Sequence, residues 1–215
     1  MEVLHLRKDE NALTRAAVLA SDALRTDGVV LYPTDTLYGL GADALSDEAV
    51  AKVYAIKGRR EDKPMHCIVA DLEMAERYGE IGDVARQLAR ELPRGKVSFI
   101  VPKKKGYDSG ICRGIASFGF RIPDNDVCQA LLKSFGGPIT ATSANKSDEV
   151  PERDVEKILV QLGEPGLSID IALDAGKLPA SLPSTVVDLT HPQPLIVREG
   201  AVSATDIWDI IRQED

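Results

Sequence analysis

Short apolar segments alternate with amphipathic segments along the whole 215-residue chain, and this alternation strongly constrains the fold. The apolar segments have the length of strands, whereas the segments between them repeat apolar residues every three or four positions, as helices do. Such alternation is typical of βαβ units, in which helices pack against an open sheet. No repeat, low-complexity stretch or linker interrupts it. We therefore expect an α/β fold in which residues 1–215 form a single domain.

Capping residues and turn residues locate the expected elements. The expected strands are residues 2–6, 29–32, 65–70, 97–101, 117–122, 139–143, 168–173, 184–189 and 195–198. Two expected helices are marked by an apolar face: one by Leu13, Ala17, Ala20 and Leu24, ending at Gly28, and one by Val155, Ile158, Leu159 and Leu162. The other expected helices are marked by their first residues, with caps at Ser46, Asp71 and Asp83, a cap near Asp124 for the helix that ends at Gly136, and a start at Ser203. Residues 33–45 and 103–114 are expected to be loops.

The composition is that of an ordinary globular protein. Hydrophobic residues make up 44% of the chain, charged residues make up 28%, and no apolar run is long enough to span a membrane. The N-terminus does not have the pattern of a signal peptide. Cys67, Cys112 and Cys128 lack the spacing of a disulfide framework or a zinc site. We expect a soluble, cytoplasmic protein with no membrane partner.

The net charge of −8 makes the position of the basic residues informative, because an acidic chain needs local positive charge to bind an anion. Lys57 continues the apolar stripe of the helix after Ser46, seven positions beyond Val50, and Arg59, Arg60 and Lys63 follow it. One interpretation is a lysine that extends into solvent, followed by a charged loop. The other is a clamp for phosphate or carboxylate groups.

Two expected strands carry small polar residues on one face. In residues 117–122, Ser117, Gly119 and Arg121 alternate with Phe118 and Phe120. Residues 139–143 carry the hydroxyl residues Thr140, Thr142 and Ser143, and Asn145 follows the end of that strand. A face of this kind is exposed to solvent or lines a cavity, and open α/β sheets bind ligands at the carboxyl ends of their strands.

Common catalytic and nucleotide-binding motifs are missing or out of context. Residues 39–44 match G-x-G-x-x-A, but six residues separate them from the preceding strand, so we do not interpret them as a dinucleotide site. The chain contains neither a P-loop nor a nucleophile elbow. His5, His66 and His191 lack metal-ligand spacing, which favours structural roles.

Three motifs in order resemble one family. YPTDTLYGLGADA (residues 32–44), KGR (57–59) and SAN (143–145), supported by GFRIPDND, PSTVVDLT and VREGAVS, resemble the YrdC domain family of threonylcarbamoyl-AMP synthases. The resemblance covers roughly residues 8–205 and is that of a short, single-domain member. It implies a twisted, open mixed sheet with flanking helices and a concave, positively charged cavity. It also implies that L-threonine, bicarbonate or CO2, and ATP react to give threonylcarbamoyl-AMP and pyrophosphate.

The same resemblance assigns roles to matching residues of this chain. The implied catalytic residues are Lys57 and Arg59, the threonine-binding residues are Thr34, Thr36, Arg121, Ala141 and Ser184, and the ATP-binding residues are Lys57, Arg59, Lys63, Ser117, Ser143, Asn145 and Arg198. No protein ligand for a metal is implied, and Mg²⁺ would arrive with ATP. Other proteins would transfer the product to a tRNA adenosine to make t6A, and this chain would contact tRNA weakly at most.

The sequence departs from the family pattern at a few positions. Ile68 stands where some members have a histidine, and His66 lies two residues earlier. The usual arginine after S-A-N is missing, with Lys146 and Arg153 as alternatives, and Ser117 replaces a threonine. PRGKVS also stands in place of P-G-P-[LI]-T. A related enzyme that acts on another carbamoyl- or acyl-adenylate therefore remains an alternative. A non-catalytic RNA-binding module is a second one, which the net charge disfavours.

Overall fold

The computed structural model describes residues 1–6, 10–60 and 63–212. Its strands are β1 (Glu2–His5), β2 (Val30–Pro33), β3 (Tyr38–Gly41), β4 (His66–Ile68), β5 (Val97–Pro102), β6 (Ser117–Arg121), β7 (Ile139–Ser143), β8 (Ile171–Asp174), β9 (Thr185–Asp188) and β10 (Leu195–Arg198). Within these residues the strands form one sheet in the order β1-β8-β2-β3-β7-β4-β6-β5-β9-β10. Parallel and antiparallel pairs both occur, which confirms the mixed sheet.

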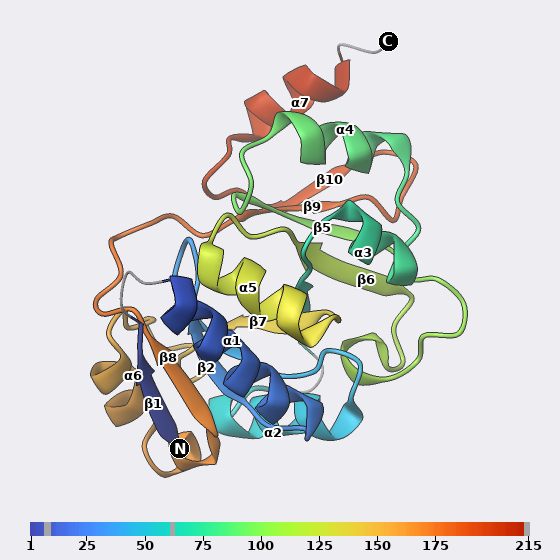
Figure 1. Cartoon of the computed structure of the whole chain (residues 1–215). Coiled ribbons are helices and arrows are strands. Elements are labelled where there is room, and N and C mark those ends of the chain that lie inside the picture. Colours follow the sequence, from blue (N-terminus) through green and yellow to red (C-terminus); the bar gives the residue numbers. More distant parts are fainter. Residues whose placement is uncertain (7–9, 61–62, 213–215) are drawn as a thin grey trace.

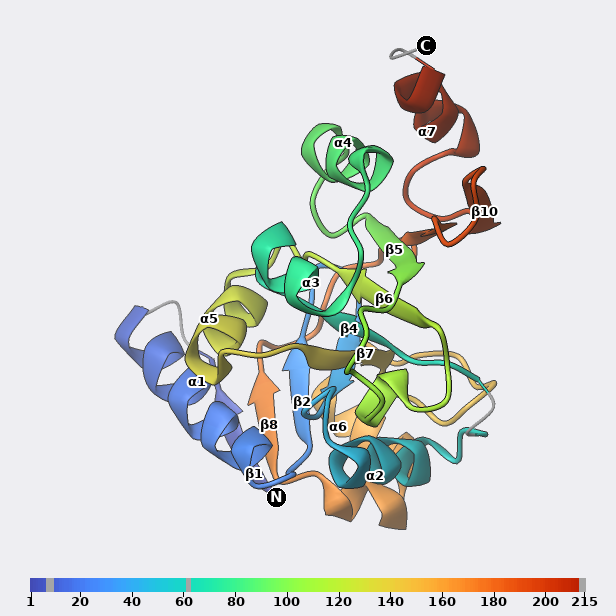
Figure 2. The ribbon, with the colours of Figure 1, turned by 90° about the vertical axis from the view of Figure 1, so that its right-hand side faces the viewer.

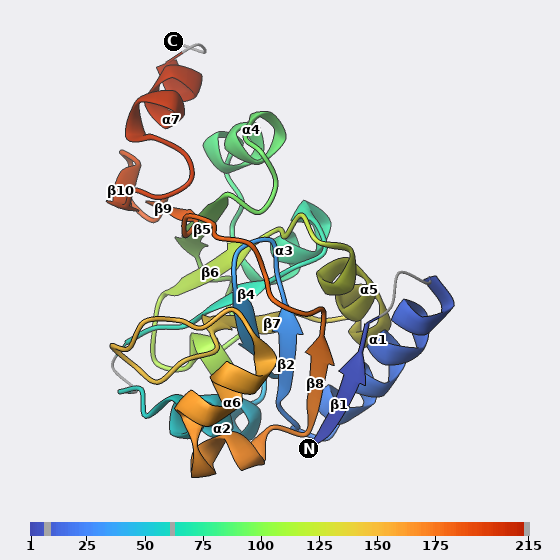
Figure 3. The same ribbon diagram turned by 90° about the vertical axis from the view of Figure 1, so that its left-hand side faces the viewer.

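The sheet is flanked by α1 (Glu10–Arg25), α2 (Asp47–Lys57), α3 (Leu72–Tyr78), α4 (Asp83–Glu91), α5 (Asp126–Phe135), α6 (Val155–Leu162) and α7 (Ala204–Ile211). Short 3₁₀ helices cover Gly110–Cys112 and Glu164–Ser168. Helices α1 and α5 pack together on one side of the sheet, and α6 lies on the other (Figures 2 and 3). Helix α7 lies beside α4, near the C-terminus and far from the N-terminus (Figure 1). No helix in the described part of the chain could cross a membrane.

The core consists of apolar residues that alternate along the strands. Phe118 and Phe120 of β6 are fully buried, as expected from their shared face, and the ring of Phe120 lies 5.4 Å from that of Phe99 on β5. Arg121 follows on the opposite face, where it is buried beside the hairpin of β2 and β3. The alternation of β6 therefore separates the core from a polar surface of the sheet.

The prediction that residues 33–45 form a loop is wrong, because they include β3, which pairs with both β2 and β7. The glycines that suggested a loop make room for a side chain of the neighbouring strand. A Cβ atom on Gly41 would lie 2.8 Å from Cε1 of Tyr32, and one on Gly39 would lie 3.0 Å from Cζ of the same ring. The G-x-G-x-x-A match thus begins within a strand.

The expected N-caps are confirmed at Ser46, Asp71 and Ser203, whose side chains accept hydrogen bonds from backbone N–H groups of the first helical turn. Asn125 caps α5, which agrees with a cap expected near Asp124. The cap predicted at Asp83 is wrong by one residue, because Gly82 precedes α4 and Asp83 is its first residue.

Candidate functional site

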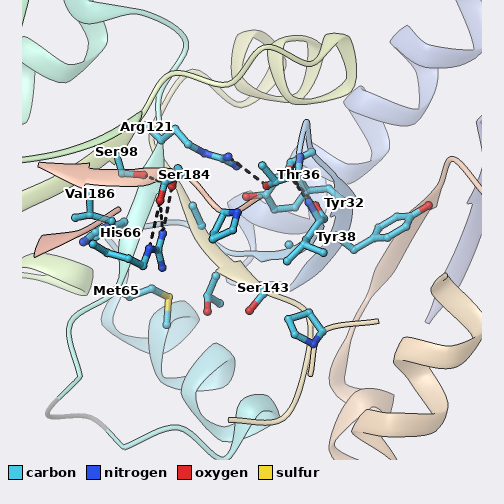
Figure 4. Close-up of a pocket in the computed structure, with 18 of the residues that line it drawn as sticks. Tyr32, Thr36, Tyr38, Met65, His66, Ser98, Arg121, Ser143, Ser184 and Val186 are labelled. Atoms are coloured by element: carbon cyan, nitrogen blue, oxygen red, sulfur yellow. Dashed lines mark hydrogen bonds between the residues drawn. The ribbon is translucent and has the colours of Figure 1, made fainter. Parts of the chain in front are cut away.

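A cavity of about 370 Å³ opens on the polar surface of the sheet. Figure 4 shows side chains around it from several strands, with Tyr32 and Thr36 across from Ser98 and Ser184. Its described lining contains three arginines, six serines and threonines, and no acidic residue. The residues that line it are Tyr32, Thr34, Thr36, Leu37, Tyr38, Gly39, Arg59, Pro64, Met65, His66, Ser98, Arg121, Ala141, Thr142, Ser143, Pro151, Pro183, Ser184, Val186 and Arg198.

The turn between β2 and β3 holds Arg121. Thr34 organises this turn, since its Oγ1 donates to the Leu37 carbonyl at 2.7 Å and accepts from the Thr36 N–H at 3.0 Å. Arg121 Nη1 donates to the Gly95 carbonyl at 3.1 Å and to Thr36 Oγ1 at 3.3 Å, and it lies 3.5 Å from Asp35 Oδ2. These contacts hold the guanidinium against the cavity wall.

Ser184 and Arg198 form another wall of the cavity. Arg198 donates to the Ser184 carbonyl from Nη2 at 2.7 Å and from Nε at 3.2 Å. Ser184 Oγ lies 2.9 Å from Ser98 Oγ on β5, and these two serines are buried, whereas Arg198 is exposed. Partial desolvation of its guanidinium, followed by the nearby charge of Arg121, lowers the pKa of Arg198. These contacts bring a cation and two hydroxyls to one side of the cavity.

Lys57 and the segment that follows β7 form a buried network. Lys57 is 3% exposed, and its Nζ donates to the carbonyls of Ser143 and Asn145, the latter at 2.8 Å, and to Asn145 Oδ1 at 3.1 Å. The interpretation of a lysine that extends into solvent is therefore wrong. Burial, followed by the charge of Arg59, lowers the pKa of Lys57 to about 8.

The remaining residues of the K-x-R segment lie closer to solvent. Arg59 lines the cavity and donates to backbone carbonyls of its own loop, from Nη2 to Pro64 at 2.9 Å and from Nε to Lys63 at 3.3 Å. The side chain of Lys63 is exposed and lies 3.4 Å from Asp148 Oδ1. The two basic residues thus differ, because only Arg59 faces the cavity.

His66 lies in the cavity wall, although the sequence favoured a structural role for it. Burial, followed by the charges of Arg198, Arg59 and Arg121, lowers its pKa to about 4, so the imidazole is neutral at physiological pH. The ring lies directly over Gly119 of β6, where a Cβ atom would come within 2.3 Å of the imidazole Cδ2. The glycine on the polar face of β6 therefore makes room for this ring.

Two thirds of the residues singled out from the sequence meet at the cavity. Those in its lining are Thr34, Thr36, Arg59, Arg121, Ala141, Ser143, Ser184 and Arg198, whereas Lys57, Lys63, Ser117 and Asn145 lie outside it. Ser98, His66 and Tyr32 were not predicted to be there. Ser98 carried a signal, since it is a polar residue within an apolar strand. In the described part of the chain, no three His, Cys, Asp or Glu side chains are grouped as metal ligands.

The comparisons with known proteins agree on one family. The Sua5/YciO/YrdC family model, described as "Telomere recombination", matches residues 22–200. A Bos taurus protein named threonylcarbamoyl-AMP synthase is 35% identical over 190 residues, which cover 87% of this chain and 68% of that protein.

Two solved structures share the fold. One is Sua5 of Pyrococcus abyssi complexed with L-threonine, with a TM-score of 0.85 and 28% identity, and this chain spans 60% of its length. The alignment covers 98% of the present chain. The other is Escherichia coli YciO, with a TM-score of 0.80 and 27% identity over 96% of this chain and 98% of that one. The family match and these likenesses show that the chain belongs to the Sua5/YciO/YrdC family.

Proposed function

We propose that this protein acts as a threonylcarbamoyl-AMP synthase, which converts L-threonine, CO2 or bicarbonate, and ATP into threonylcarbamoyl-AMP and pyrophosphate. The observation that carries the proposal is the cavity, whose lining contains three arginines and six serines and threonines. Support also comes from the relatives, one named for this activity and one complexed with L-threonine. The cavity volume of about 370 Å³ falls within the range of roughly 300–1,000 Å³ that is usual for small-molecule sites.

The reaction requires two anions to approach each other. The neutral amine of threonine attacks CO2, forms a C–N bond and loses a proton, which gives a carbamate. A carbamate oxygen then attacks the α-phosphorus of ATP, and pyrophosphate leaves with the electrons of the broken P–O bond. If bicarbonate is the carbon source, one water is also released. Fixed cations lower the repulsion between carbamate and phosphate, because they need no reorganisation at the moment of reaction.

The positions of the arginines suggest how the substrates are divided. Arg121, held by the turn of Thr34 and Thr36, suits the carboxylate of threonine, since a guanidinium pairs with a carboxylate through two parallel hydrogen bonds. Arg59 and Arg198 lie at other parts of the same cavity and suit the phosphates. Mg²⁺ would enter with the triphosphate, whose oxygens are ligands that this ion prefers.

The ATP-binding roles of Lys63, Ser117 and Asn145 stay predictions, as these residues lie outside the cavity lining. A cytoplasmic location is likewise a prediction from the sequence. We propose that other proteins transfer the threonylcarbamoyl group to tRNA, because the cavity offers small-molecule chemistry and the chain carries a net charge of −8, which disfavours a long phosphate backbone.

The test is pyrophosphate release by the purified protein in the presence of Mg²⁺ and ATP. Release should require both L-threonine and bicarbonate, and mass spectrometry should detect threonylcarbamoyl-AMP. Arg198→Gln should lower kcat/KM about tenfold or more, because it removes one charge-assisted contact, and about 1.4 kcal/mol corresponds to a factor of ten. Lys133→Gln, a change to an exposed lysine of α5, is the matched control.

Other outcomes would redirect the assignment. Pyrophosphate release that is indifferent to threonine would favour a related enzyme for another carbamoyl- or acyl-adenylate. No ATP binding, together with a salt-sensitive gel shift of tRNA, would favour an RNA-binding module.

A further inference from the structure

The ammonium group of Lys57 has a complete set of hydrogen-bond acceptors within the protein. A lysine ammonium carries three N–H donors. In this structure three oxygens from one short segment accept from Nζ, namely the carbonyls of Ser143 and Asn145 and the side-chain Oδ1 of Asn145. The side chain is 3% exposed and lies outside the cavity lining. A contact with a substrate phosphate would require at least one of these buried hydrogen bonds to break.

The same segment is tied to the end of α2 by its backbone as well. The Ser147 N–H donates to the Lys57 carbonyl at 2.9 Å. Asn145 Oδ1 also accepts from Ser143 Oγ at 2.5 Å, while Asn145 Nδ2 donates to the Glu149 carbonyl at 2.7 Å. Lys57 therefore stands at the centre of a network that joins α2 to residues 143–149.

The network also determines the positions of two residues that line the cavity. Gly58 ends α2 in a left-handed conformation with φ of 57°, and Arg59 follows at once and faces the cavity. On the other side of the network Ser143 lines the cavity, and Figure 4 shows its side chain at the cavity wall. A displaced Lys57 would allow both walls to move relative to each other.

We propose that Lys57 is a positioning residue, whose ammonium fixes Ser143 and Asn145 and does not itself bind a substrate. This inference rests on the proposed function for its effect on catalysis, but its structural part can be tested in the protein alone. It revises the role that the family resemblance implies for Lys57, which is that of a residue in contact with the substrates.

The charge of Lys57 matters for this role. An ammonium donates three hydrogen bonds, whereas a neutral amine donates two and turns a lone pair toward an acceptor oxygen. The groups from residues 143–145 that face Nζ are uncharged oxygens, and Arg59 is the charged group that acts on it. With a pKa of about 8, deprotonation would weaken the network as pH rises above that value.

The decisive measurement is hydrogen–deuterium exchange of residues 143–149 in the protein without substrates. Lys57→Met removes the ammonium and keeps most of the side-chain length. It should accelerate exchange of the Ser147 amide about tenfold or more, since hydrogen bonds to a charged group are lost, while α1 and α5 exchange as in the wild type. Lys52→Met is the matched control, because Lys52 lies on the same helix and donates to the Asp27 carbonyl instead.

The kinetic readout separates positioning from direct contact. The wild type should lose activity above about pH 8 as Lys57 is deprotonated. Lys57→Met should lower kcat/KM for ATP about tenfold and should not show this pH dependence. Lys57→Arg should restore part of the protection from exchange and part of the activity. Unchanged exchange in Lys57→Met combined with lost ATP binding would overturn the proposal in favour of direct contact.

A second variant covers the case in which Lys57→Met fails to fold. Asn145→Ala keeps the ammonium and removes one of its acceptors together with the hydrogen bond from Asn145 Nδ2 to the Glu149 carbonyl, so it should also accelerate exchange in residues 143–149. Wild-type exchange rates in this variant would show that the network does not hold the segment. If the wild-type protein releases no pyrophosphate, the proposed function fails, and the exchange result still decides whether Lys57 positions the segment.

Discussion

Replacing Asp35 with asparagine should destabilise the protein through the loss of one buried ion pair. Asp35 Oδ2 lies 3.5 Å from Arg121 Nη1, and the two side chains are only 7% and 9% exposed. The other carboxylate oxygen of Asp35, Oδ1, is buried without a hydrogen-bond partner. The carboxylate packs closely against Gly95, where a Cβ atom would lie 2.2 Å from Asp35 Oδ2. The carboxylate thus depends on Arg121 for compensation.

The magnitude follows from the distance and the burial. Two unit charges at 3.5 Å attract each other by about 4.7 kcal/mol at an effective dielectric constant of about 20. Asparagine keeps two polar atoms in the same place but relieves the desolvation cost of the buried charge, which offsets about 1–3 kcal/mol of this attraction. The net decrease in the free energy of unfolding should be about 2–4 kcal/mol, which is close to the range for breaking a buried pair.

The assay is urea unfolding of the single and double variants, with an exposed pair as the control. Asp148 Oδ1 and Lys63 Nζ lie 3.4 Å apart, almost the same distance, but these side chains are 83% and 49% exposed. Asp148→Asn should therefore cost less than about 1 kcal/mol. In a double-mutant cycle, Asp35→Asn and Arg121→Gln should show a coupling of at least about 1 kcal/mol. The reasoning is refuted if Asp35→Asn costs no more than Asp148→Asn.

Two further predictions concern His66 and its contact with Gly119. In Gly119→Ala the new methyl group would meet the imidazole at 2.3 Å. The variant should therefore lose about 1–3 kcal/mol of unfolding free energy in urea titrations and release pyrophosphate more slowly. Wild-type stability and activity would contradict the described position of the ring. The pKa of His66 is lowered from 6.5 in the unfolded chain to about 4 in the folded protein. Between these two values the unfolded chain binds a proton that the folded protein does not, so the free energy of unfolding should fall as the pH is lowered through this window. His66→Asn should reduce the pH dependence of the unfolding free energy there by about 1–3 kcal/mol, and an unchanged dependence would show that the imidazole is not held neutral.

Most elements could be predicted from the sequence because their signals are local. The alternation of β6 and the caps at Ser46 and Asp71 depend on neighbouring residues alone. Strand β3 escaped prediction because its glycines are explained by the ring of Tyr32, which lies on the adjacent strand. A glycine that makes room for a side chain has the same letter as one that makes a turn.

The candidate site shows the same division between local and distant information. The polar face of β6 indicated that Arg121 faces solvent or a cavity, and the structure places it in a cavity wall. The burial of Lys57 could not be predicted, since its acceptors lie on Ser143 and Asn145, more than eighty positions away. The placement of His66 depends in the same way on Gly119, which belongs to a different strand.

The position of β8 has a consequence for the order in which the protein can be completed. Strand β8 lies between β1 and β2 and is parallel to both, with Ile171 opposite Glu2 on one side and Val30 on the other. During synthesis β1 therefore leaves the ribosome long before the strand that it pairs with, and β2 has one unpaired edge for the same period. Pairs so distant along the chain must close a long loop before they gain any contact, which slows folding. Until residue 174 has been made, β1 lacks its partner strand, and its backbone groups must not pair with another strand in the meantime.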